Sequence, residues 1–127
     1  MPNVPTLLLF NVAPEKRARI QVTALRAGCR LRAVPPERFG CTLSQLLSGQ
    51  EGAQAPEEPF GEELLVMAGL DEHRMDFVLT ALRRERTPVA LKAVVTATNA
   101  SWTAQELYAE LCREREAFAA GRQAHQK

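Results

Sequence analysis

Residues 62–111 alternate between apolar runs typical of buried strands and stretches with helical periodicity, and few folds accommodate that alternation. The run Leu64–Ala68 is continuously apolar and stops at Gly69, as expected of a strand that is buried on both faces. A second run, Val89–Val95, is rich in β-branched residues. Apolar residues between the two runs recur at helical intervals, at Met75, Val78, Leu79 and Leu82. The segment therefore predicts a strand, a helix and a second strand.

A tightly specified turn then leads into another helix. Thr103 and Glu106 have the spacing of a capping box, in which each side chain accepts a hydrogen bond from the other residue's backbone amide. Trp102 and Leu107 occupy the positions of a hydrophobic staple, which fixes how the chain enters the helix. These signals predict that residues 96–103 form a held connection rather than a loose loop.

Three segments of this region resemble DUF3783, a family of small bacterial proteins that contain a domain of unknown function. They are Leu65-Val-Met-Ala-Gly-Leu70, Leu91-Lys-Ala-Val-Val-Thr-Ala-Thr-Asn-Ala-Ser-Trp102 and Leu107-Tyr-Ala-Glu-Leu111. The resemblance covers roughly the C-terminal half of the chain. It implies a small soluble bacterial protein, and it brings no known activity, cofactor or catalytic residue with it.

The N-terminal half repeats the same rhythm with weaker signals. Leu7–Phe10 is an apolar run that predicts a central strand, and a helix is expected over 14–27. Arg30–Val34 alternates polar with apolar residues, which is typical of a half-exposed edge strand. A second capping-box pattern predicts a short helix at 42–48. Residues 50–61 are rich in Glu, Gln, Gly, Ala and Pro, and they predict a surface loop.

Alternation of strands with helices favours an α/β fold with a four-stranded, mainly parallel sheet. We expect the flavodoxin-like order 2-1-3-4, because the two most apolar strands, the first and the third, then lie at the centre. A ferredoxin-like split β-α-β arrangement with an added C-terminal helix also centres these strands. The short helix favours the first arrangement, since a parallel crossover needs a covering segment. Residues 1–120 are expected to form a single domain, followed by a frayed C-terminal tail at 121–127.

Composition argues against several classes of function. Sixteen Lys and Arg balance fifteen Asp and Glu, and a formal charge of +1 gives no general attraction to nucleic acid or to acidic membranes. No run is long and apolar enough to span a bilayer, and no basic segment marks a secretory signal. Three cysteines without a closely spaced pair suit a reduced, cytoplasmic protein. The sequence predicts no cofactor and no metal site, because two histidines and scattered cysteines do not make a ligand set.

Lys92 is the most informative candidate for a ligand site. A cation in the middle of an apolar strand must reach water, find a partner or have its charge suppressed. With Thr96, Thr98, Asn99 and Ser101 it could form an anion site near the start of the following helix. The alternative is an edge-strand lysine whose ammonium reaches solvent, beside short polar side chains that bond their own backbone.

A parallel sheet would bring further polar residues to the same end of the sheet, beyond the carboxyl ends of the strands. These residues are Asn11, Glu15, Asp71, Glu72 and His73. Asp71 is also a natural helix cap, and His73 has no nucleophile at a recognisable spacing, so a solvated histidine is the simpler interpretation.

We therefore expect a small cytoplasmic binding or regulatory module without catalysis of its own, acting through a protein partner or a small anionic ligand. One alternative is an enzyme or anion sensor that uses Lys92 and the turn Thr96–Ser101, helped by Asp71 or His73. Another is a homo-oligomeric structural protein. The sequence does not set the oligomeric state.

Overall fold

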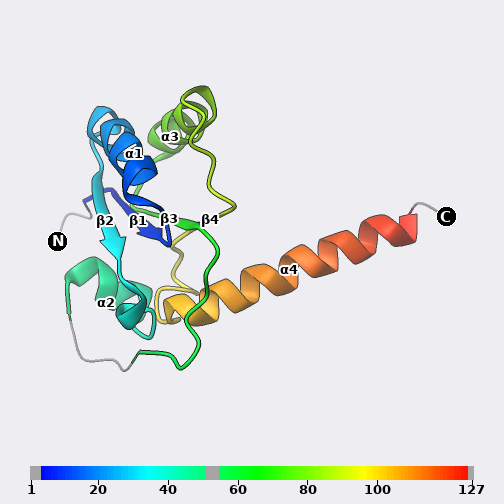
Figure 1. Ribbon diagram of the computed structural model, residues 1–127. Helices are drawn as coiled ribbons and strands as arrows, with labels where there is room; N and C mark the ends of the chain where they lie inside the picture. The colour runs from blue at the N-terminus through cyan, green and yellow to red at the C-terminus, as the bar shows by residue number, and fades with distance from the viewer. Residues whose placement is uncertain (1–3, 51–54, 126–127) are drawn as a thin grey trace.

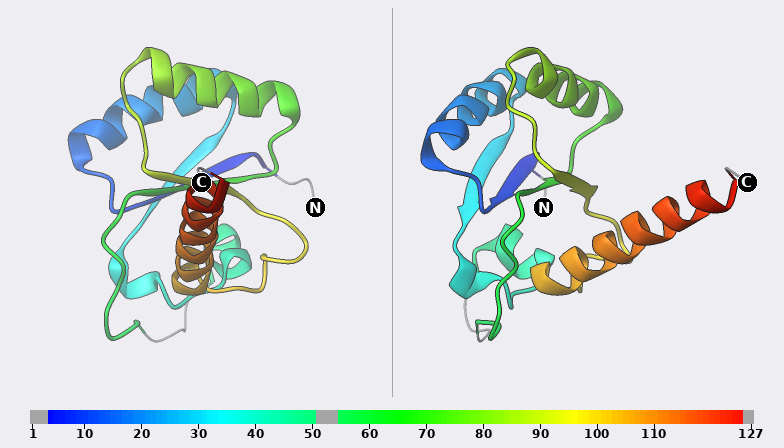
Figure 2. Two further views of the ribbon diagram at one scale, coloured as in Figure 1. Left: turned by 90° about the vertical axis from the view of Figure 1, so that its right-hand side faces the viewer. Right: turned by 45° about the vertical axis from the view of Figure 1, so that its right-hand side comes forward.

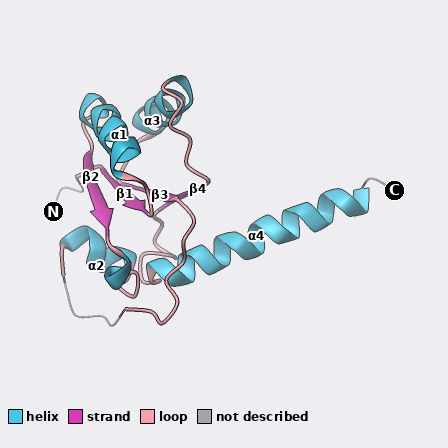
Figure 3. Ribbon diagram, in the orientation of Figure 1, coloured by secondary structure: helices cyan, strands magenta, loops and turns pink. Residues whose placement is uncertain are grey.

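The computed structural model describes residues 4–50 and 55–125, and its centre is a four-stranded sheet with helices on both faces (Figure 1). The strands are β1 (Thr6–Phe10), β2 (Arg30–Val34), β3 (Leu64–Ala68) and β4 (Leu91–Val94), in the order β2-β1-β3-β4. Helices α1 (Pro14–Ala27) and α3 (Glu72–Arg84) cover one face. The short α2 (Leu43–Ser48) and the start of α4 (Ala104–His125) cover the other face (Figure 3).

The predicted strand order is confirmed, but the sheet is mixed rather than mainly parallel. β1 runs parallel to β2, and β3 runs parallel to β4. The central pair, β1 and β3, is antiparallel, with Leu8 opposite Val66. The carboxyl ends of the two central strands therefore lie at opposite ends of the sheet. Asn11, which follows β1, is separated from Asp71, which follows β3.

The connection between β2 and β3 explains this difference from the prediction. A parallel β3 would require the chain to travel back along the whole strand length. Helix α2 has only six residues, and the chain enters β3 at the edge where it left β2. Asn11 holds this return, because its Nδ2 donates to the backbone oxygens of Phe60 and Glu62 at 2.8 and 3.0 Å. The described part of the predicted loop, residues 55–61, has no helix or strand, but it buries Phe60.

The two halves of the chain are related by a pseudo-two-fold axis that passes between Leu8 and Val66. β1, α1 and β2 correspond to β3, α3 and β4 at nearly constant spacing along the sequence. Buried Ile20 corresponds to buried Val78 in the equivalent helix. Positive φ angles also match, at Asn11 and Gly69 and again at Gly28 and Arg86. The corresponding residues are seldom identical, which is why the sequence shows no repeat beyond strand and helix rhythm.

The same axis relates four backbone hydrogen bonds between the starts of α2 and α4. The amide of Leu43 donates to Trp102, and the amide of Ala104 donates to Cys41, at 2.9 and 3.1 Å. A second reciprocal pair runs from Ser44 to Ala100 and from Gln105 to Phe39, at 3.0 and 3.1 Å. Both helices begin with a complete capping box, at Thr42 and at Thr103. We call these bonds the clasp.

Two apolar clusters fill the space above and below the sheet. All five residues of β1 and all five of β3 are buried, so both central strands contribute to both clusters. Leu8 and Val66 pack against α2 and α4, while Leu7 and Leu65 pack against α1 and α3. Burial of the central strands is what the apolar runs predict.

Helix α4 extends well beyond the rest of the molecule (Figure 2). Ala104 and Leu107 are buried in the core, and residues from 113 to 121 are exposed. The helix continues to His125, and residues 126–127 lie outside the described chain. Fraying of its end therefore stays a prediction.

A repeated tetrapeptide allows a direct stability test of this packing. Thr-Ala-Leu-Arg occurs at 23–26 and at 80–83, but the two copies are one position out of phase with the structural repeat, so Leu82 is 3% exposed and Leu25 is 69% exposed. We expect Leu82→Ala to lower the free energy of unfolding by about 2–5 kcal/mol. Leu25→Ala should change it by less than about 0.5 kcal/mol. Urea denaturation measures both, and equal losses would contradict the packing described.

Candidate functional site

A groove of about 300 Å³ runs along the outer edge of β4, between that strand and α4. Four of the residues predicted for a site line it, namely Lys92, Thr96, Thr98 and Asn99. The other wall is formed by apolar and acidic side chains, Trp102, Leu107, Leu111, Glu110 and Glu114. We call this space the edge groove. Ser101 is exposed and does not line it.

Lys92 is an exposed residue on an edge strand, and its Nζ donates to the backbone oxygen of Val89 at 3.1 Å. β4 pairs with β3 on one side only. Leu91 and Val95 donate their amides towards β3, to Glu63 and Met67 at 3.2 and 2.9 Å. Because amides alternate in direction along a strand, those of Lys92 and Val94 point outward.

Asn99 shapes the turn that closes the edge groove. Its Oδ1 accepts from the amide of Thr96 at 2.8 Å, while Thr96 Oγ1 accepts from the amide of Asn99 at 3.1 Å. Asn99 Nδ2 donates to the backbone oxygen of Val94 at 3.0 Å. The buried asparagine therefore binds its own backbone and ends the free strand edge at Val94.

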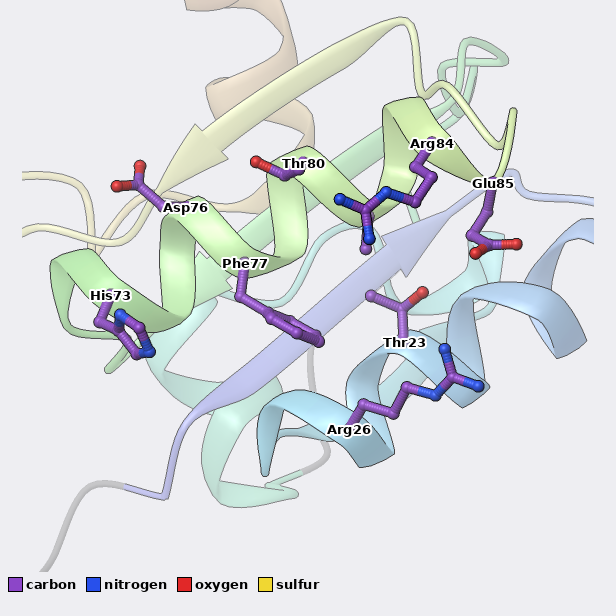
Figure 4. Close-up of a pocket in the computed structure, with 9 residues that line it drawn as sticks. Thr23, Arg26, His73, Asp76, Phe77, Thr80, Arg84 and Glu85 are labelled. Atoms are coloured by element: carbon purple, nitrogen blue, oxygen red, sulfur yellow. The ribbon is translucent and has the colours of Figure 1, made fainter.

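Asp71 and His73 lie away from the edge groove. Asp71 caps α3, accepting from the amide of Arg74 at 2.7 Å and from the guanidinium of the same residue at 3.2 Å. His73 lines a different groove of about 410 Å³ between α1 and α3. Figure 4 shows Phe77 of α3 in that groove, with Thr23 and Arg26 of α1 across from it. The structure thus separates the candidate residues into two surfaces.

Comparison with known families gives a match for residues 63–118, to a domain of unknown function, DUF3783. The chain is similar to DUF3783 over this segment, which is less than half of its length. The match confirms the resemblance seen in the sequence, and it covers β3, α3, β4 and α4 as far as residue 118. Searches of the curated proteins and of the solved structures gave no match.

The segment that matches DUF3783 is tied to the preceding loop by a polar cluster that the sequence analysis missed. Arg115 donates to both carboxylate oxygens of Glu62, at 3.1 and 2.8 Å. The hydroxyl of Tyr108 also donates to Glu62, at 2.9 Å, and its ring stacks on Phe60 with centroids 4.4 Å apart. Glu62 lies far from its partners in the sequence, so no local spacing reveals the pair. The cluster anchors α4 to this loop.

The described residues can be compared with the requirements for a metal site, a membrane-spanning helix and a reactive thiol. No group of three or more His, Cys, Asp or Glu there is arranged to hold a metal ion. No helix in the described chain is both long and apolar enough to cross a bilayer. Cys29 is buried, and burial raises the pKa of its thiol, which suits a packing residue.

The Glu62 cluster makes a prediction for titration. Hydrogen bonds from Arg115, and to a smaller degree from Tyr108, lower the pKa of Glu62 from 4.5 to about 2. The folded-state pKa is depressed, so this contribution to stability is present above pH 4.5 and is lost as the pH falls through about 2. Carbon-13 NMR of the glutamate carboxyls should show the low inflection in the native protein. In Arg115→Gln the inflection should move up towards 4.5, further than in Tyr108→Phe; an ordinary value in the native protein would contradict the cluster.

Proposed function

We propose that this chain is a binding module without catalysis, which receives an extended segment of a protein partner along β4. The observation that carries the proposal is the edge groove, where an unpaired strand edge lies beside a groove lined by both apolar and polar side chains. Extended peptides bind such edges by adding a strand, with main-chain hydrogen bonds giving affinity and side-chain pockets giving specificity.

The hydrogen-bonding part of the surface is short and well defined. Three backbone groups face outward and are open to pairing, namely the amide and carbonyl of Lys92 and the amide of Val94. The carbonyl of Val94 already accepts a hydrogen bond from Asn99. An added strand would therefore pair along Lys92–Val94 and stop at the turn. Unpaired edges of this kind are templates for another strand.

The side-chain part of the surface sets the chemistry of the partner. Trp102 and Leu111 are partly exposed and offer apolar area to those side chains of an added strand that face α4. Glu110 and Glu114 line the same wall and favour a basic residue nearby. The preferred partner is thus an extended segment that alternates apolar residues with Lys or Arg.

The same acids oppose the alternative of an anion site at Lys92. An anion in the edge groove would meet two carboxylates and one ammonium, and that ammonium already donates to Val89. We therefore assign Lys92, Thr96, Thr98 and Asn99 to the walls of a peptide groove.

Proline substitution tests the proposal on both edges of the sheet. The probes are nine-residue peptides, which are selected from a random display library for binding to the full chain. Fluorescence anisotropy then gives their dissociation constants. Val94→Pro removes an outward amide without removing a native hydrogen bond, so the fold should persist. It should weaken peptide binding by about tenfold or more, since it removes a main-chain bond and blocks the edge.

Ala33→Pro is the matched control, because Ala33 is the pseudo-two-fold counterpart of Val94 on the opposite edge strand, β2. It should leave the affinity unchanged, and circular dichroism checks that both variants fold. Equal affinity of all three proteins would exclude β4 as the binding edge. A native dimer that dissociates in Val94→Pro, seen by light scattering, would identify the added strand as a second copy of this chain.

A further inference from the structure

A cavity of about 690 Å³ lies on the α2 side of the sheet, away from the edge groove. Its wall includes Thr6 at the start of β1, Arg30 and Arg32 on β2, and Ala68 at the end of β3. Leu47 of α2 closes one side and Val95 contributes further apolar surface. We call this space the α2 cavity.

The corresponding space in the other half of the molecule is filled by Phe60, which is 6% exposed. Its ring lies 4.5 Å from that of Phe39 and 5.9 Å from that of Phe10, measured between centroids. Its backbone amide donates to Gln105 Oε1 at 3.2 Å, and its oxygen accepts from Asn11. The stacked ring of Tyr108 is a third aromatic neighbour of Phe60, and the side chain is buried.

Around the α2 cavity, several residues are smaller than those at the corresponding positions. Leu47 stands in place of Tyr108, Ala68 in place of Phe10, and Gly69 in place of Asn11. Ala100 likewise corresponds to Phe39, and Ser44 to Gln105. Among the described residues, the half that contains α2 lacks the aromatic cluster that fills the counterpart of this space.

The polar lining of the α2 cavity has one sign of charge. Arg30 and Arg32 replace Leu91 and Ala93 of the other half, and Ser44 and Ser48 add hydroxyl groups. None of the lining residues, which all belong to the described chain, is acidic. Arg32 is held in place because its Nη1 donates to the backbone oxygen of Leu46 at 3.1 Å. Two guanidinium groups beside an apolar floor are suited to an anion that carries a ring.

We infer that the α2 cavity binds a small anionic ligand, a carboxylate or a phosphate ester attached to a flat apolar group. The apolar group takes the place that Phe60 takes in the other half, and the anion faces Arg30 and Arg32. The α2 cavity and the edge groove share no lining residue, and Val95 of the cavity lies between Val94 and Thr96 of the groove in the chain.

The fluorescent probe 1-anilinonaphthalene-8-sulfonate, an anion with aromatic rings, tests the site on the full chain. We expect saturable binding, with nitrogen-15 NMR shifts at the amides of Gly69 and Val95. Arg30→Gln should weaken binding by about tenfold, the loss expected for one charge-assisted hydrogen bond. Arg83→Gln removes the same charge at an exposed position outside the cavities described here, and it should bind the probe like the native protein.

Leu47→Tyr provides a second variant that leaves both arginines intact. It copies Tyr108 from the other half and should prevent probe binding by filling the cavity. Displacement by phenylacetate rather than by phenyl phosphate would identify a carboxylate site, and the reverse order would identify a phosphate site. Unchanged probe affinity in Arg30→Gln and Leu47→Tyr, or shifts confined to Phe77 and Thr80 in the groove between α1 and α3, would overturn the inference.

Discussion

The antiparallel pairing of β1 with β3 is the constraint on which the rest of the structure depends. Each half of the chain supplies one parallel strand pair, and a two-stranded unit is at best marginally stable alone. Joined at Leu8 and Val66, the two central strands become buried on both faces and at both edges. The segment that matches DUF3783 contains β3 and β4, and the residues before it supply the other two strands of the sheet.

The two halves related by the pseudo-two-fold axis have similar backbones but different side chains. In the clasp, α2 and α4 make matching backbone hydrogen bonds to each other, and both begin with a capping box. Only the second half has the rings of Phe60 and Tyr108 and the ion pair of Glu62 with Arg115. α2 ends after six residues at Gly49, whose φ of 78° is left-handed, whereas α4 continues to His125.

Local signals in the sequence predicted the elements and their order, whereas the strand directions depended on a distant contact. Capping boxes and apolar periods involve neighbours within four residues, so Thr103 and Val78 were informative by themselves. The direction of β3 depends on the return through Phe60, a single aromatic in a segment whose composition indicates only a loop.

For the candidate site too, residues close in the sequence were grouped correctly and distant ones were not. Lys92, Thr96 and Asn99 are close in sequence and do share the edge groove. His73 comes from the opposite face of the sheet, and no pattern in the sequence could show that without the packing of α3.

The edge groove has a firm wall because of where α4 is anchored. A helix that leaves its core is only marginally stable in water, so the exposed end of α4 depends on the fixed start of the helix. The capping box at Thr103 fixes that start, and the contact of Arg115 with Glu62 fixes the helix three turns later. Leu111 and Glu114 lie between these two anchors. A partner strand therefore meets a preformed wall and loses little binding energy to ordering it.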